Sequence, residues 1–349
     1  MGREVKNMHI DKSYVLNLAE EILSIPSPSG YTKEISERII KEATSFGLHH
    51  ERTKKGNVLI TMPGKSDIRI GLSVHVDTLG AMVRSINADG SLRFTTIGGP
   101  LWATMDGEYC TVCTREGKHY TGTFLSTSPA VHVFKDAAKK ERSPENMVVR
   151  IDETVKSKED VEQLGIGVGD YLFFDPKTTI TPSGFIKSRF LDDKINVASI
   201  FGLIKALKDA DEQPAHTLIF IISTYEEVGH GAAYIPDLDE MVAVDMGCIG
   251  DDLSCTEYDV SICAKDSSGP YDYELTSLFK TLATQNNINH AVDIYPYYGS
   301  DVSAAMRGGN DLKGALIGPG VHASHGMERT HYDAVQSTID LLYHYVMKP

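Results

Sequence analysis

Four short stretches of this sequence are apolar almost from end to end. They cover residues 68–76, 218–223, 241–244 and 312–317. A strand with one face in water alternates apolar and polar side chains, whereas a strand covered on both faces does not. The four stretches therefore predict central strands of a sheet sandwiched by helices, an α/β fold for which we expect a mixed sheet. Helical stripes flank them after Asp11, from Ile35 to Phe46, through Ile200 and Leu207, and over 334–347.

The pattern of apolar and polar residues is different between about residues 80 and 183. Short alternating segments with glycine and proline turns replace the helical stripes there. Strands are expected over 109–114, 119–124, 147–151 and 170–174. With 349 residues, the chain is longer than one core usually covers. We expect a discontinuous α/β catalytic domain, 1–80 and 184–349, interrupted by a small β-rich insertion, 81–183.

Composition excludes several classes of partner. The chain has 34 basic and 48 acidic residues and a net charge of -14, which repels phosphate backbones, so nucleic acid is not an expected partner. No apolar run approaches the ~20 residues of a membrane span. The first ten residues lack the apolar run of a secretory signal, and five cysteines do not make a disulfide framework; we expect a cytoplasmic protein. Cys110 and Cys113 are expected to be buried structural residues on a strand.

Residues that follow the apolar stretches are the candidates for a site, because ligands of open α/β sheets bind outside the carboxyl ends of the strands. The first stretch runs into His75 and Asp77, which share one face of a strand. A carboxylate beside a metal-bound imidazole accepts the other ring N–H and orients the ring. Glu226 and Glu227 follow the second stretch, and Asp245 follows the third. Two adjacent carboxylates are costly to bury unless they bind a cation or each other. One of them can then be a metal ligand while its neighbour acts as a base.

Two further groups belong to the same set. Asp192 and Asp193 lie where the insertion returns to the α/β domain, and three histidines, His322, His325 and His331, follow the last stretch. Taken singly, each feature has a plain structural interpretation, such as a helix cap or a packed histidine. Together they favour one site for Zn, Co, Mn or Fe(II), since mixed imidazole and carboxylate ligands suit those ions. Two such ions about 3.5–4 Å apart promote hydrolysis.

The order and spacing of these motifs resemble the M42 metallo-aminopeptidases. The likeness covers nearly the whole chain, from Pro-Ser-Gly30 through HVDTLG, LDDK, YEEVG and VDMG to GSDVSAA. It implies a metallo-exopeptidase fold and hydrolysis of the N-terminal peptide bond of short peptides. It also implies that the β-rich insertion mediates assembly into a homo-oligomer, commonly a hollow twelve-subunit particle.

The resemblance implies a role for each matched residue. One metal would be held by His75, Asp192 and Asp245, and the other by Asp192, Glu227 and a late histidine, so that Asp192 bridges the two. Glu226 would be the general base, and Asp77 would orient His75. The ions implied are two divalent metals per subunit, Zn or Co, with Mn as a third candidate.

Three positions depart from the family pattern. The segment GPGVHASHGMERTH stands where the family usually has Arg-Tyr-x-His-Ser-x-x-Glu. We expect His325 to be the last metal ligand, with His322 as the alternative. Tyr225 replaces the usual Gln before the paired acids, and His-Gly-Ala-Ala follows Gly229, which bears on substrate preference. Asp301 matches an acid of the family and is a candidate substrate contact, although capping a helix is an equal alternative.

Three other functions remain open at this point. A related amide hydrolase would act on an N-acylated or otherwise blocked metabolite, and activity on acetylated substrates would reveal it. A glycoside hydrolase also uses paired acids but needs no metal. The third alternative is a non-catalytic assembly protein, which would not explain the set of candidate metal ligands.

Overall fold

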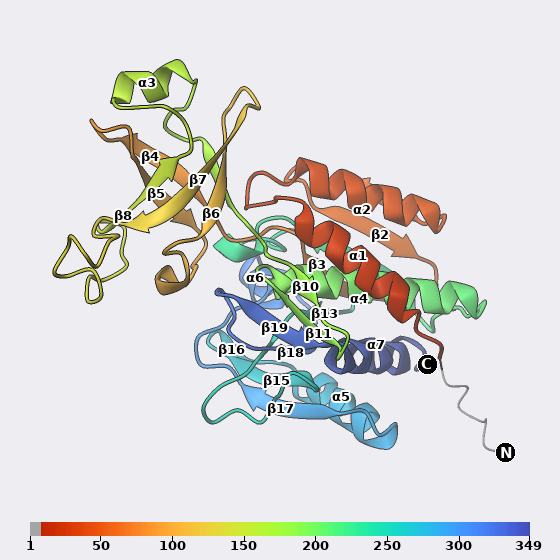
Figure 1. The fold of residues 1–349 in the computed structure, drawn as a ribbon. Coiled ribbons are helices and arrows are strands. Elements are labelled where there is room, and N and C mark those ends of the chain that lie inside the picture. Colours follow the sequence, from red (N-terminus) through yellow and green to blue (C-terminus); the bar gives the residue numbers. More distant parts are fainter. Residues whose placement is uncertain (1–7) are drawn as a thin grey trace.

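The computed structural model describes residues 8–349 (Figure 1). Residues 1–7, which hold most of the stretch used to expect a cytoplasmic chain, lie outside the described residues. The helices are α1 (Lys12–Ser24), α2 (Lys33–Ser45), α3 (Lys158–Gln163), α4 (Leu191–Asp209), α5 (Tyr273–Gln285), α6 (Asp301–Arg307) and α7 (Tyr332–Val346), with 3-10 turns η1 (Trp102–Thr104) and η2 (Glu226–Val228). Within 8–349, no helix is both long and apolar enough to span a membrane.

A mixed sheet of ten strands forms the centre of the molecule, which confirms the expected α/β fold. Its order is β1-β2-β12-β3-β13-β18-β15-β16, with β14 beside β18 and β17 beside β15. These strands are β1 (His49–Arg52), β2 (Val58–Met62), β3 (Arg69–His75), β12 (Thr217–Ser223), β13 (Glu240–Val244), β14 (Gly247–Cys248), β15 (Val260–Asp266), β16 (Gly269–Pro270), β17 (His290–Ile294) and β18 (Lys313–Val321). The four predicted apolar stretches are β3, β12, β13 and β18, which pair in parallel.

The central strands are apolar throughout because both faces of the sheet are covered. Along β12, Phe220 and Ile222 pack into the larger core, which also takes in apolar residues of α1, α2, α4, α5 and α7. Ile219 and Ile221 alternate with these two residues along β12. They pack on the other face of the sheet with residues of α6 and of the loop before β13. Figure 1 shows α1, α4 and α7 side by side against the sheet. Strand alternation therefore distributes apolar side chains to two cores.

The parallel strands end at one edge of the sheet. Ser223 at the end of β12 lies opposite His75 at the end of β3, and Val244 of β13 lies opposite Ile317 of β18. The next residue on β18 is Gly318, where a Cβ atom would lie 1.6 Å from the carbonyl oxygen of Asp245. Glycine at 318 thus lets β18 pass closely beside Asp245. The acids and histidines predicted at the strand ends consequently emerge at the same edge.

The segment after β3 forms a closed β-barrel. Its strands are β4 (Gly80–Ile86), β5 (Leu92–Ile97), β6 (Tyr109–Cys113), β7 (His119–Ser126), β8 (Met147–Ile151) and β9 (Tyr171–Phe174). The ring of Phe124 lies 4.9 Å from the rings of both Phe94 and Phe174, so side chains fill the interior. Cys110 and Cys113 are buried and free, as expected. The barrel stands apart from the large sheet in Figure 1; the boundaries 81–183 stay a prediction.

A small sheet connects the two segments that follow the barrel and the last central strand. It contains β10 (Thr179–Ile180), β11 (Phe185–Ser188) and β19 (Glu328–His331). Ser188 of β11 lies opposite Glu328 of β19. The residues just before Asp192 are thereby held beside the residues just after His325, although they are distant in the sequence.

Candidate active site

His75 occupies the end of β3 and is almost completely buried. Its Nδ1 lies 2.9 Å from the main-chain carbonyl oxygen of Asp77 and 3.6 Å from the Asp77 carboxylate. The carbonyl is therefore the nearer acceptor for this ring nitrogen, where the sequence had suggested the carboxylate. This contact leaves Nε2 facing the site, 3.0 Å from Asp192 and 3.7 Å from Glu226. An imidazole oriented in this way presents one free nitrogen to a ligand.

The carboxylate of Asp77 organises the paired acids. It accepts hydrogen bonds from the backbone N–H groups of Glu226 at 3.0 Å and Glu227 at 3.3 Å. It also accepts a hydrogen bond from the Ser29 hydroxyl at 2.5 Å. Asp77 consequently anchors η2, the turn that carries both glutamates, in addition to contacting His75.

Asp192 stands between two histidines at the start of α4. One carboxylate oxygen lies 3.0 Å from His75 Nε2, and the other lies 3.6 Å from His325 Nε2. His325 Nε2 is also 3.6 Å from Glu227. The structure thus brings together His75, Asp192, Glu227 and His325, with one carboxylate placed to face two imidazoles.

Two groups of side chains in this region could each hold a metal ion. They are His75 with Asp192 and Glu227, and His75 with Asp193 and Asp245. Asp193 was not singled out as a ligand from the sequence, where only its position beside Asp192 pointed to it. Its carboxylate accepts hydrogen bonds from the backbone N–H of His75 at 3.0 Å and from Asn196 at 2.6 Å. Asp193 therefore also holds the His75 backbone in place.

The late histidines have three different positions. His325 faces the site, whereas His322 is exposed and pairs through its backbone with Arg329. His331 caps α7, where its side chain accepts a hydrogen bond from the N–H of Asp333. Glu328, which was not predicted as a site residue, accepts hydrogen bonds from the N–H of His325 at 2.9 Å and from that of Asp192 at 3.1 Å. This buried acid joins the two segments.

The electrostatics of the site favour cations. Burial, reinforced by repulsion from Asp192, raises the pKa of Asp245 to about 7 and that of Glu328 to about 8. Burial likewise raises the pKa of Glu226 and of Glu227 well above the ordinary value. The buried carboxylates outnumber the two imidazoles. Divalent cations would compensate this charge, and imidazole with carboxylate donors suits Zn, Co or Mn.

The pKa values of the two imidazoles are raised by the neighbouring carboxylates. Burial alone would lower the pKa of His325, but the contacts with Asp192 and Glu227 raise it to about 10. Burial would also raise the pKa of Asp192, yet hydrogen bonds with His325 and His75 hold it below its ordinary value. In the absence of metal, protons on these histidines therefore stabilise the Asp192 carboxylate.

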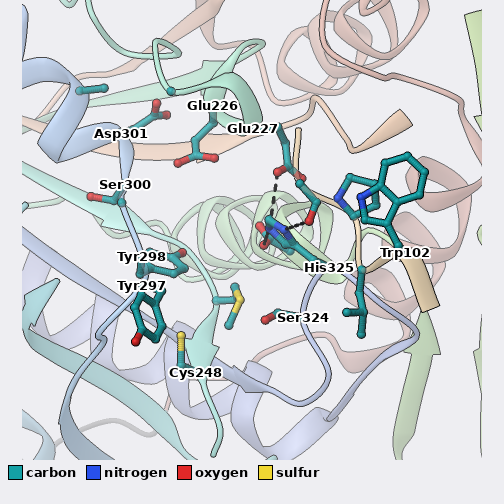
Figure 2. A pocket seen from close by; sticks show the side chains of 18 of the residues that line it. Trp102, Glu226, Glu227, Cys248, Tyr297, Tyr298, Ser300, Asp301, Ser324 and His325 are labelled. Atoms are coloured by element: carbon teal, nitrogen blue, oxygen red, sulfur yellow. Dashed lines mark hydrogen bonds and ion pairs between the residues drawn. The ribbon is translucent and has the colours of Figure 1, made fainter. Parts of the chain in front are cut away.

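A cavity of about 1090 Å³ is lined in part by Asp192, Glu226, Glu227 and His325. Figure 2 shows Trp102 and His325 on one side of it and Tyr297 and Tyr298 across from them. Asp301 also lines the cavity, but its two oxygens accept hydrogen bonds from the Ser73 hydroxyl at 2.7 Å and the Ala232 N–H at 2.9 Å. A volume of this size accommodates the end of a peptide.

Comparisons with known proteins identify a family and a fold that this chain resembles. The family model of the M42 glutamyl aminopeptidases matches residues 56–341. The chain is 48% identical, over 96% of its length and 97% of the relative's, to the Bacillus subtilis protein named "Putative aminopeptidase YhfE". A TET aminopeptidase from a Thaumarchaeota archaeon has the same fold, with 21% identity, 96% of each chain covered and a TM-score of 0.87.

A second solved structure bears on assembly. The TET1 peptidase of Pyrococcus horikoshii is 24% identical, with 96% of this chain and 100% of that chain covered and a TM-score of 0.83. That peptidase is described as assembling into a tetrahedron or a large octahedral shell. At this identity the likeness establishes the fold of the present chain.

Proposed function

Because the chain belongs to the M42 glutamyl aminopeptidase family, we propose that it hydrolyses the N-terminal peptide bond of short peptides by means of two divalent metal ions. The observation that carries the proposal is the position of Asp192, whose two oxygens face His75 and His325. We assign one ion to His75, Asp192 and Asp245, and the other to Asp192, Glu227 and His325. Asp192 is then the bridge between them.

The chemistry follows from the placement of the remaining acids. When bound, a pair of such ions lowers the pKa of water and polarises a carbonyl group. Glu226, the general base in this scheme, takes a proton from the attacking water and delivers it to the departing amine. Asp77 accepts a hydrogen bond from the backbone N–H of Glu226, and so holds in place the turn that carries the base. Substrate contact by Asp301 stays a prediction, since both its oxygens have partners.

Metal removal tests the proposal directly. After exhaustive chelation, activity on unblocked aminoacyl chromogenic amides is expected to fall by at least about a hundredfold, because several kcal/mol of transition-state stabilisation come from the ions. Separate addition of Zn, Co and Mn should restore it and identify the preferred ion. N-acetylated amides serve as the control. Cleavage of the acetylated form alone would replace this assignment with the blocked-metabolite hydrolase.

We also propose that the chain forms a homo-oligomer through the barrel. The loop between β7 and β8 exposes apolar side chains: Val131 is 70% exposed and Val133 is 74% exposed. Exposed apolar side chains close together on one loop are typical of a surface that contacts another protein. The similar TET1 peptidase is described as assembling into shells. Sedimentation of the full chain is expected to show an assembly, and a twelve-subunit particle is the form to look for first. A monomer at micromolar concentration would contradict the proposal.

A further inference from the structure

His325 is held in place largely by residues from the barrel side of the molecule. Its Nδ1 lies 2.9 Å from the carbonyl oxygen of Gly99, and its own carbonyl oxygen accepts a hydrogen bond from the N–H of Leu101 at 2.9 Å. Gly99 and Leu101 belong to the segment 98–104, the first part of the connection between β5 and β6, which includes η1. The carbonyl of Gly99 therefore determines which nitrogen His325 turns toward the site.

The backbone of His325 needs such support. Its φ angle is +61°, in the left-handed region, and that of Ala323 is +60°. A residue other than glycine pays roughly 1–2 kcal/mol for this conformation. His325 is also the more exposed of the two imidazoles, since 39% of its side chain is accessible against 1% for His75. Contacts from neighbouring segments must therefore keep its loop in one conformation.

Arg189 joins the two segments that meet at His325. It lies three residues before Asp192 and is 3% exposed. Its guanidinium donates hydrogen bonds to the carbonyl oxygen of Thr104 at 2.6 Å and to that of Gly326 at 3.3 Å. Thr104 ends the segment 98–104, and Gly326 follows His325 directly. One side chain thus spans the barrel segment, the histidine loop and the strand that leads to Asp192.

The chemistry of arginine suits this position. A planar guanidinium presents several N–H donors in a rigid arrangement and reaches two carbonyl oxygens at once, which an ammonium group on a flexible stem does not reproduce. The buried charge is only partly compensated, because Glu108 lies 3.5 Å away. Burial accordingly lowers the pKa of Arg189. Burying an incompletely paired charge costs free energy, whereas the hydrogen bonds of Arg189 hold Thr104 and Gly326 in a fixed arrangement.

We propose that Arg189 is a positioning residue for His325 and controls how tightly the second metal ion, that of Asp192, Glu227 and His325, is bound. This inference rests on the proposed two-metal function. It predicts a selective effect, since within residues 8–349 neither His75 nor Asp245 is hydrogen-bonded to Arg189 or to segment 98–104. The barrel would then take part in forming the metal site.

Metal titration of the full-length protein tests the inference. Isothermal titration with Zn and elemental analysis are expected to show two ions on the wild type. In Arg189→Met the affinity for one ion should fall by about 10–100-fold, as for other residues that orient a ligand, while the affinity for the other is unchanged. Activity should return at high metal concentration. Arg189→Lys should show a smaller loss, and Arg150→Met, an exposed barrel arginine, should show none.

The alternative outcomes are distinct. Equal weakening of both ions, or of neither, in a folded Arg189→Met protein would overturn the positioning role. If that variant does not fold, the same titration on Arg189→Lys decides, and wild-type affinities in it would overturn the role as well. Fewer than two ions on the wild type would instead refute the two-metal proposal itself, whatever the variants do.

Discussion

Glu226→Gln is expected to lower kcat by about a thousandfold while the protein still binds two metal ions. The amide has nearly the shape of the carboxylate but is not basic, and positioned acid–base catalysis contributes about 10²–10⁴-fold. The backbone N–H that fixes residue 226 against Asp77 is untouched by the change. The value of KM should therefore change little, because substrate binding and the metal ligands are preserved.

Steady-state kinetics on the preferred aminoacyl amide, combined with metal analysis, measures this effect. Glu159→Gln, at an exposed position on α3, is the matched control and should behave as wild type. A Glu226→Gln enzyme that keeps more than about a tenth of kcat would show that another group carries the proton. Loss of an ion in this variant would instead make Glu226 a metal ligand.

Asp192→Asn is expected to abolish activity because it weakens both metal ions. The carboxylate faces His75 with one oxygen and His325 with the other. Asparagine supplies one neutral oxygen and cannot bridge two cations. Affinity for each ion should fall by more than about a hundredfold, beyond the effect of losing an outer contact. In the assignment proposed above, Asp192 is the ligand shared by both ions, so a simultaneous loss of both is the expected result for this substitution.

Thermal unfolding gives an independent measurement. Metal that binds only the folded state raises Tm in the wild type, and this increase should disappear in Asp192→Asn. Asp209→Asn, at the end of the same helix, is the control, since its carboxylate pairs with Lys205 at the surface. If one ion still raised Tm of Asp192→Asn with wild-type affinity, Asp192 would be a ligand of one metal and not a bridge.

Much of the large domain could be predicted from local pattern. Strands β12 and β13 each begin one residue before the predicted ranges 218–223 and 241–244 and end where those ranges end. Asp11 caps α1, its side chain accepting a hydrogen bond from the N–H of Tyr14. Strands β15 and β17 and helix α5 were not predicted. Strand β17 has only five residues, alternately buried and partly exposed, and so short a pattern carries little periodic signal. Its strand conformation depends on pairing with β15.

Closure of the barrel could not be predicted either. The insertion was expected to be β-rich, but closure requires β4 to pair with β9, and Ala81 lies opposite Leu172. The alternation of apolar and polar residues along a strand indicates which of its faces is buried, but it does not identify the strand with which it pairs. The same limit applies to Arg189, an ordinary basic residue in the sequence whose two carbonyl partners come from distant loops.

By itself, the sequence determined which side chains stand at the ends of the buried strands, because chain order places His75, Glu226, Glu227 and Asp245 directly after apolar runs. Only the tertiary structure decided that Asp192 lies between His75 and His325, and that His325 rather than His322 turns toward the cavity. These distances depend on strand order, on register and on hydrogen bonds between segments far apart in the chain. Local sequence encodes the conformation of each segment, whereas packing sets the separation between segments.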